Sequence, residues 1–571
     1  MNISQYIAAF LANAGVQNVY ELSGGMIMQL LDAIYVQGQP RLINVYHEQA
    51  AAFAADAAGR VAGIPGVALA TSGPGAVNLL TGIGSCYFDS SPAVFITGQV
   101  NRHEQKGTRS IRQLGFQETD VVTMAGPITK AAYRIEDSAE VPELLCRAFD
   151  LAVNGRPGPV LLDIPMDVFR SQIDAPVPHW KRSPPEEDLA PAEQQLRQLQ
   201  ESLAQAERPL ILAGGGVRAA DAHKQFVTLV ELLQIPVVNS LLAVDALTSS
   251  HPLHAGMIGT YGNRWSNTAI SRSDLLLVLG SRLDIRQTGA DTTSFAAGRQ
   301  IWHVDTEQGE INNRVTGCYA IRSHLQSFCR DAANALEPVS CQPWLDEIDS
   351  LRKKWPDTSE LDGCHGINPN EFMHVLSAGK TPSAWCVDVG LHQMWSAQSL
   401  EINGSSRFLT SGGMGAMGFA LPAALGVALT CPGQPAVVIA GDGGFQLNLQ
   451  ELQTVAQHRL PIKIVVLNNN SHGMTRQFQD TYFEKRYAGT VEGYSTPAFD
   501  KIAAAYGVRS KRISSPEEMS AAAEWFWASE DEPVLLEVQV PTTTNAYPKL
   551  AFGLPISEME PQATPREMEA T

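Results

Sequence analysis

The chain alternates short, fully apolar runs with longer amphipathic runs along most of its 571 residues. Short apolar runs are typical of buried parallel strands, and amphipathic runs are typical of the helices that cover them. The pattern predicts an α/β fold with mostly parallel sheets flanked by helices. Because a chain of this length is too long for one hydrophobic core, we expect three or four domains.

Two segments have the composition of linkers. The segment 174–191 is rich in proline and charge, and the run 356–369 is polar. Such residues favour extended connections over packed elements. We therefore predict three domains followed by a tail that wraps the surface or frays, at residues 1–173, 192–340, 365–545 and 546–571.

Two distant segments share one pattern. Residues 67–75 and residues 436–444 each form an apolar run that ends in a glycine turn. Such an internal repeat predicts that the first and third domains are structurally related.

Charge and composition exclude several classes of protein. The chain has 41 Lys and Arg against 59 Asp and Glu, a net charge of −18, which disfavours a nucleic acid or an anionic membrane as a partner. The uncharged stretches 61–88 and 408–441 are long enough to span a bilayer, but their glycines and prolines favour buried strands and turns. The eight cysteines form no Cys-x-x-Cys pair, and no basic targeting segment begins the chain. We expect a cytoplasmic protein with small-molecule partners.

The third domain contains a candidate magnesium and diphosphate site. An apolar run ends at Gly441, Asp442, Gly443 and Gly444, and the next apolar run ends before Asn469. One βαβ unit separates them, so we expect both side chains at the tips of neighbouring strands. Mg²⁺ prefers a few protein oxygens completed by phosphate and water. The alternative interpretation is an ordinary pair of βα turns.

This pair of motifs resembles the signature of the thiamin-diphosphate enzymes, in which Gly-Asp-Gly precedes Asn-Asn by one such unit. The resemblance implies that magnesium on the diphosphate is held by Asp442, the Asn469 side chain and the Ser471 carbonyl. It also implies cofactor contacts by Gly441, Gly443, Gly444 and Met474.

The first domain offers an acid. Glu48 lies in the motif His-Glu-Gln-Ala-Ala at the start of an Ala-rich helix. A helical Glu is usually solvated, but a buried one has a raised pKa and can exchange a proton with a ring nitrogen. The motif is similar to that of the same family, which implies that Glu48 exchanges a proton with the cofactor's aminopyrimidine.

Further segments closely resemble the acetolactate synthase group, at 71–78, 89–92, 96–100, 388–395 and 411–418. The resemblance implies that Met417 wedges between the rings of the cofactor and that the Gly415 carbonyl meets its amino group. It implies additional cofactor contacts by Gly25, Pro74, Asn78 and Gln393. Without a cofactor, these positions would be glycine turns and a core methionine.

Three positions resemble the reaction pocket of the synthases. Phe116 and Gln117 match the pair that lines it, and Lys130 matches a nearby basic residue, so all three are catalytic candidates. The His-His pair of pyruvate-decarboxylase-like relatives is absent from this region of the sequence. Carboligation is therefore favoured over release of a free aldehyde.

The middle domain suggests a flavin. The run 209–213 ends in Gly214 and Gly215, a turn suited to a nucleotide diphosphate, although such a turn can be purely structural. Later segments resemble the FAD-binding segments of acetolactate synthases, whose FAD is structural. This resemblance implies FAD contacts by Gly280, Arg282, Arg286 and Asp305. The alternative interpretation of Arg286 is an arginine on the protein surface.

Two departures concern the second substrate. The biosynthetic synthases have Trp where this chain has Phe478 and Met where it has Thr260, at positions that border the acceptor site. Smaller side chains should widen that pocket. Our hypothesis is a carboligase with pyruvate as the donor and a ketone or 2-oxoacid as the acceptor. The acceptor would then include a nucleotide-linked keto-sugar of the kind used in yersiniose-type deoxysugar synthesis.

Three alternatives remain open at this stage: an acetolactate synthase that condenses two pyruvates, a flavin-dependent pyruvate oxidase, and a subunit that binds cofactor without catalysis. The last is disfavoured because Glu48, Asp442 and Asn469 are all present. The resemblance also implies a homodimer or homotetramer in which two subunits complete each site.

Overall fold

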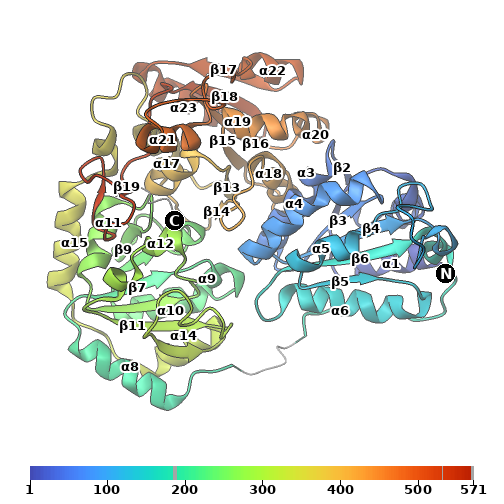
Figure 1. Cartoon of the computed structure of the whole chain (residues 1–571), viewed down its shortest axis with the longest axis horizontal. Helices are drawn as coiled ribbons and strands as arrows, with labels where there is room; N and C mark the ends of the chain where they lie inside the picture. The colour runs from blue at the N-terminus through green and yellow to red at the C-terminus, as the bar shows by residue number, and fades with distance from the viewer. Residues whose placement is uncertain (184–188, 530, 567–571) are drawn as a thin grey trace.

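The structure is a computed structural model that describes residues 1–183, 189–529 and 531–566. It contains three six-stranded parallel sheets flanked by helices (Figure 1). This confirms the predicted α/β fold. A short antiparallel pair, β19 (Lys549–Leu550) and β20 (Met559–Glu560), lies near the end of the chain. Residues 184–188 of the first predicted linker lie outside the described residues.

The first sheet has the strand order β2-β1-β3-β4-β6-β5. Its central strands are buried along their whole length because helices cover both faces. The strands are β1 (Asn18–Leu22), β2 (Arg41–Asn44), β3 (Gly66–Ala70), β4 (Ala93–Gln99), β5 (Ala131–Arg134) and β6 (Pro159–Pro165). The helices are α1 (Ile3–Asn13), α2 (Met28–Gln37), α3 (Glu48–Ala62), α4 (Pro74–Asp89), α5 (Val121–Ala125), α6 (Val141–Val153) and α7 (Met166–Arg170).

The third sheet, β14-β13-β15-β16-β18-β17, repeats the order of the first strand for strand. The structural relation between the first and third domains that the internal repeat predicts is therefore confirmed. Its strands are β13 (Ala384–Val387), β14 (Arg407–Leu409), β15 (Ala436–Gly441), β16 (Ile462–Asn468), β17 (Arg509–Ile513) and β18 (Val534–Gln539). Its helices are α16 (Pro369–Ser377), α17 (Leu391–Ser399), α18 (Ala420–Thr430), α19 (Asp442–Leu447), α20 (Leu452–His458), α21 (Gly473–Tyr482), α22 (Phe499–Ala505) and α23 (Met519–Trp527).

The central sheet has a different order, β12-β11-β10-β7-β8-β9, in which the strand order reverses between β7 and β10. In open parallel sheets, ligands bind at such a switch point, at the carboxyl ends of the strands. The strands are β7 (Pro209–Ala213), β8 (Val237–Asn239), β9 (His254–Met257), β10 (Leu275–Leu279), β11 (Gln300–Asp305) and β12 (Tyr319–Arg322). The helices are α8 (Glu193–Gln205), α9 (Gly216–Ala219), α10 (His223–Leu233), α11 (Arg264–Arg272), α12 (Ile285–Thr288), α13 (Thr292–Ala296), α14 (Leu325–Ala335) and α15 (Gln342–Lys354).

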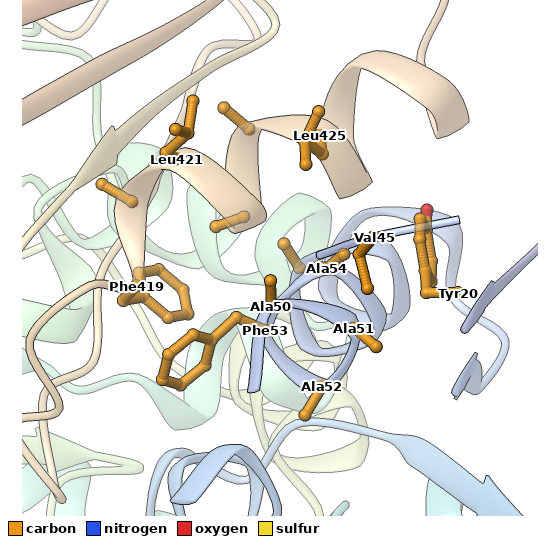
Figure 2. Packing of buried hydrophobic residues seen from close by; sticks show 14 of the residues in the cluster. Tyr20, Val45, Ala50, Ala51, Ala52, Phe53, Ala54, Phe419, Leu421 and Leu425 are labelled. Atoms are coloured by element: carbon orange, nitrogen blue, oxygen red, sulfur yellow. The ribbon is translucent and has the colours of Figure 1, made fainter. Parts of the chain in front are cut away.

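The first and third domains pack through α3 and α18, which lie side by side in Figure 2. Successive alanines leave α3 thin enough to be buried on every side, and the Phe53 and Phe419 rings meet edge to face at 5.4 Å. A Cβ atom on Gly426 would lie 2.2 Å from the Ala54 carbonyl oxygen. Only glycine therefore allows the two backbones to approach this closely.

The second predicted linker and the tail are more ordered than their composition indicates. Within 356–369, a 3-10 turn at Asp357–Leu361 carries Glu360 to a buried ion pair with Arg264, 2.6 Å apart. In the tail, β19 and β20 are joined by an ion pair of 2.9 Å between Lys549 and Glu560. Arg264 also donates to the tail carbonyl oxygens of Met559 at 3.3 Å and Glu560 at 3.1 Å, so both segments are anchored to the central domain.

The two uncharged stretches fold into strands and helices of the first and third domains. The first contains β3 and α4, and the second contains β14, α18 and β15. In the part of the chain that the structure describes, no helix has both the length and the apolar character needed to cross a bilayer.

Candidate active site

Asp442, Asn469 and Ser471 meet at one edge of the third sheet. β15 and β16 are parallel neighbours, so Asp442 and Asn469 follow adjacent strand ends. The Ser471 backbone N–H donates to the Asp442 Oδ2 atom at 3.3 Å and to the Asn469 Oδ1 atom at 3.1 Å. Burial raises the pKa of Asp442 to about 6. The three predicted metal ligands are thus brought together by local hydrogen bonds.

Buried polar atoms without partners surround this edge. Within the described residues, Ser471 Oγ and Gln393 Oε1 are buried and have no hydrogen-bond partner. Buried polar groups are rarely left unpaired, so such atoms indicate a site for a polar ligand. The Tyr494 ring packs on His472 at 4.3 Å, and both lie beside Gly443. An oxygen ligand set next to unpaired polar atoms fits a hydrated magnesium ion with a diphosphate.

Asp388 connects the glycine turn to the segment that precedes α18. Its carboxylate accepts backbone N–H groups of Gly418 at 2.9 Å and Ala420 at 3.1 Å, and burial raises its pKa to about 6. A Cβ atom on Gly444 would lie 2.7 Å from Asp388 Oδ1. Gly415, nearby in the chain, has a φ of +66°, which glycine adopts readily. Asp388 therefore fixes the segment that carries Gly415 and Met417.

Two more predicted cofactor residues lie on the helices around this edge. Gln393 on α17 is buried and donates through Nε2 to the Thr410 hydroxyl at 2.7 Å. The Met474 sulfur on α21 accepts a hydrogen bond from the Tyr261 hydroxyl at 3.1 Å. His392, which precedes Gln393, accepts the Gly441 N–H at 3.2 Å, and burial lowers its pKa to about 3. Its imidazole is therefore neutral at physiological pH.

Glu48 begins α3 and is 6 % exposed. Its Oε2 atom accepts a hydrogen bond of 2.9 Å from the Asn78 side chain on α4. A Cβ atom on Gly75 would lie 3.1 Å from Glu48 Oε1, so a glycine leaves room for the carboxylate. Of the other predicted contacts, Pro74 is the exposed first residue of α4, and Gly25 is the exposed first residue of a 3-10 turn.

Gln117 has a backbone conformation unusual for a residue with a side chain, with a φ of +66°. Its carbonyl accepts the Thr119 hydroxyl at 3.3 Å, and the Thr119 carbonyl accepts Gln99 Nε2 at 2.7 Å. Such strain persists only where the surroundings fix the backbone, and it is common at functional sites. Phe116 is 79 % exposed beside it. The catalytic roles of both stay predictions.

Lys130, the third catalytic candidate of the first domain, is half-buried. Its ammonium donates to the carbonyl oxygens of Asn154 at 2.6 Å and Arg156 at 2.7 Å. Burial lowers its pKa to about 8. These contacts tie the ammonium to the backbone of another loop, and the catalytic role of Lys130 stays a prediction. That loop carries Arg156 into the cleft described next.

A cleft of about 1280 Å³, counting the space open to solvent, runs along the carboxyl ends of the central sheet. The predicted Gly215, Gly280, Arg282, Arg286 and Asp305 all line it. Gly214 lies beneath, where a Cβ atom would be 2.1 Å from the Gly280 carbonyl oxygen. Burial raises the pKa of Asp305 to about 6. A long cleft with glycines, arginines and a carboxylate at a switch point fits a dinucleotide.

The two predicted acceptor residues lie on different elements. Thr260 lines the cleft, and its hydroxyl donates to the Arg286 carbonyl at 3.1 Å. The Leu550 N–H of the tail donates to the Thr260 carbonyl, so the tail supports this wall. Phe478 on α21 is 40 % exposed and packs on Tyr482 at 4.8 Å. Met394, next to Gln393, also lines the cleft, which therefore reaches the third domain.

Sequence comparison identifies the class of protein. Three family descriptions match the chain in order: the N-terminal TPP binding domain of the thiamine pyrophosphate enzymes over residues 1–124, their central domain over 196–332 and their C-terminal TPP binding domain over 388–538. Thiamine pyrophosphate is thiamin diphosphate. The fold and the acidic sheet edge thus belong to an enzyme that depends on this cofactor.

Full-length relatives narrow the class. The acetolactate synthase large subunit of Cyanidium caldarium is 34 % identical, covering 95 % of this chain and 94 % of that protein. The isozyme 2 large subunit of Escherichia coli strain K12 is 35 % identical, covering 98 % and 99 %. A probable acetolactate synthase large subunit of Methanocaldococcus jannaschii is 36 % identical, covering 95 % and 92 %. The chain therefore belongs to the acetolactate synthase-like family of thiamin-diphosphate-dependent enzymes.

Proposed function

We propose that this enzyme is an acetolactate synthase, a carboligase that condenses two molecules of pyruvate with loss of carbon dioxide. The observation that carries the proposal is the third-domain sheet edge, where Asp442, Asn469 and Ser471 converge among unpaired polar atoms. The relatives that match nearly the whole chain are named for this reaction, which favours it over transfer to a keto-sugar.

The proposal assigns three bound groups. Magnesium would be held by Asp442, Asn469 and the Ser471 carbonyl, which supply the hard oxygen ligands that this ion prefers. Thiamin diphosphate, when bound, supplies the electron sink for decarboxylating a 2-oxoacid and joining the remaining two-carbon unit to a second carbonyl. FAD would occupy the central cleft in a structural role.

Glu48 would hold and move a proton at the pyrimidine ring of the cofactor. A carboxyl that is 6 % exposed and hydrogen-bonded to Asn78 is oriented and shielded from water. General acid–base groups need a fixed geometry relative to the proton that they transfer. Met417 would set the bent shape of the cofactor, since Asp388 fixes its segment.

We propose that two copies of the chain complete each site. In a single chain, apolar side chains near the candidate site are open to solvent, including Phe116, Met414 and Leu447, with Leu447 50 % exposed. Large exposed apolar groups of this kind are typical of surfaces that a partner covers. Light scattering of the purified protein would test this by its mass: a homodimer or homotetramer is expected, and a monomer would contradict it.

A bulkier ketone acceptor, such as a nucleotide-linked keto-sugar, is the second candidate. The specific observation in its favour is Thr260, a small residue on the wall of a cleft that continues toward Met394. The partly exposed Phe478 lies on the neighbouring α21. A pocket with less side-chain volume accepts larger substrates.

One experiment separates these reactions. The enzyme with thiamin diphosphate, Mg²⁺ and FAD is incubated with pyruvate alone and with pyruvate plus a panel of ketones and 2-oxoacids, and products are identified by mass spectrometry. Acetolactate at full rate from pyruvate alone supports the proposal. Products only with a ketone would replace it with the second candidate. Bleaching of the flavin under anaerobic pyruvate would instead indicate an oxidase.

A further inference from the structure

Glu451 is a buried carboxylate that no part of the proposed reaction uses. It ends a 3-10 turn, Leu449–Glu451, that follows α19 in the third domain, and it is 0 % exposed. Its Oε1 atom accepts the backbone N–H of Tyr46 in the first domain at 2.9 Å. Its Oε2 atom accepts the Thr454 hydroxyl at 3.0 Å. Burying a carboxylate costs free energy unless its oxygens accept hydrogen bonds. Here both oxygens accept one, and the Tyr46 bond crosses the boundary between the first and third domains.

The partner backbone is the segment that leads directly into Glu48. Tyr46 lies two residues before Glu48, and His47 caps the helix that Glu48 begins. Thr454, held by Glu451, also donates to the Asn44 carbonyl at 3.3 Å. The backbone on the N-terminal side of Glu48 is therefore held by two side chains of the third domain.

A second contact holds the other side of Glu48. Asn448, three residues before Glu451, donates to the Gln49 side chain at 3.3 Å and to the Gly418 carbonyl at 2.8 Å. Tyr46 and Gln49 thus flank Glu48, and both are bound by the same turn of the third domain. Because Glu48 is the first residue of α3, a small rotation of this turn would move its carboxyl. Misplacement by ~1 Å can cost about 100-fold in rate.

We propose that Glu451 is a positioning residue that sets the orientation of the Glu48 carboxyl through the backbone at Tyr46. The inference rests on the proposed role of Glu48 in proton transfer. Burial raises the pKa of Glu451 to about 7, so its protonated form is accessible near neutral pH. A glutamine has the shape of that neutral form and can still accept the Tyr46 N–H. We therefore expect Glu451→Gln to preserve most of the function that Glu451→Ala removes.

The test is a double-mutant cycle on the enzyme loaded with thiamin diphosphate and Mg²⁺. The readout is the rate at which the acidic ring C–H of the bound cofactor exchanges with deuterium, measured by NMR after acid quench, together with kcat. We expect Glu451→Ala to slow exchange by roughly 10- to 100-fold and Glu451→Gln by less than about 3-fold. In a Glu48→Gln background, Glu451→Ala should have no further effect, since it acts through Glu48.

Controls separate positioning from loss of folding. Asn18→Ala removes another hydrogen bond between the first and third domains, from Asn18 to the Leu429 carbonyl, without touching the segment around Glu48; it should leave the exchange rate unchanged. Thr454→Val removes the hydroxyl that bonds both Glu451 and the Asn44 carbonyl. It should give a smaller effect of the same kind if Glu451→Ala does not fold. Calorimetry of thiamin diphosphate binding checks that each variant retains the cofactor.

Each outcome decides one question. Multiplicative effects of Glu451→Ala and Glu48→Gln, or a Glu451→Gln variant as slow as Glu451→Ala, would overturn the positioning role. An unchanged exchange rate in Glu48→Gln alone would overturn the proposed role of Glu48 itself. The two failures are therefore distinguishable.

Discussion

The first and third domains have the same strand order but carry different chemistry at the carboxyl ends of their strands. In the first domain, the helix after β2 presents Glu48, whose carboxylate is bonded to Asn78. In the third, the strand ends of β15 and β16 present Asp442 and Asn469. Under the proposed function, one topology would provide a proton-exchanging acid in one copy and an oxygen-rich anchor for magnesium in the other. The difference lies in a few residues at the strand ends, while the two sheets have the same strand order.

Removing the anchor should have the largest effect. Asp442→Ala deletes the carboxylate that would bind magnesium, so we expect activity to fall below detection and the affinity for thiamin diphosphate with Mg²⁺ to fall at least about 100-fold. Isothermal titration calorimetry measures the affinity. Glu524→Ala, an exposed acid on α23 of the same domain, is the control. Unchanged cofactor affinity in Asp442→Ala would show that Asp442 does not bind the magnesium ion.

Removing the acid should affect catalysis without affecting retention of the cofactor. We expect Glu48→Gln to lower kcat by about 100- to 10,000-fold, the range for loss of a positioned proton-transfer group. Binding of thiamin diphosphate should change little, since the anchor is intact. Steady-state kinetics and calorimetry check the two parts, with the exposed Glu143→Gln on α6 as the control. If Glu48→Gln lowered cofactor affinity as much as kcat, the first domain would also serve to retain the cofactor, which would contradict the division of roles between the two domains.

The contact between the domains should respond to pH through Glu451. Its folded pKa of about 7 lies above the ordinary value of 4.5, so its contribution to stability is complete below pH 4.5 and is lost as the pH rises through 7. The shift corresponds to on the order of 3 kcal/mol. We expect the wild type to lose stability relative to Glu451→Gln between pH 5 and pH 8, as followed by thermal unfolding. A constant difference between the two proteins would contradict this.

The smallest effect concerns the close helix contact. Gly426→Ala adds a methyl group that would meet the Ala54 carbonyl at 2.2 Å. Overpacking of this kind costs about 1 to 3 kcal/mol, which exceeds the ~1 kcal/mol that alanine gains in a helix. Chemical denaturation should therefore show a less stable protein. Gly309→Ala, where the added methyl group meets open space, should be neutral; a stabilised Gly426→Ala would show that the helices can separate.

The sequence was informative wherever a signal was local. An apolar strand followed by a glycine turn is a property of a few consecutive residues, so the run 436–444 predicted both the strand and the position of Asp442. The repeated pattern at 67–75 likewise predicted the shared topology. The composition of 356–369 did not indicate the buried ion pair of Glu360, because that pair depends on Arg264, which is distant in the sequence.

Features that depend on tertiary contacts could not be predicted in this way. Tyr494 and His472 lie beside Gly443, but no spacing rule connects Tyr494 to the glycine turn. The bonds from the Lys130 ammonium to the carbonyls of Asn154 and Arg156 likewise have no signal in the sequence. Glu451 has no motif of its own, and its role emerges only from the bond to Tyr46.

The glycine at position 426 has a consequence for motion. The backbones of the two helices α3 and α18 touch without intervening side chains, and the Phe419 and Phe53 rings pack edge to face, so we expect the close packing to resist sliding along the helix axes. Sliding of packed helices is one of the two usual ways in which domains open around a substrate. In the proposed enzyme, we therefore expect the first and third domains of one chain to move as one body, with substrate entry depending on loops and hinge movement.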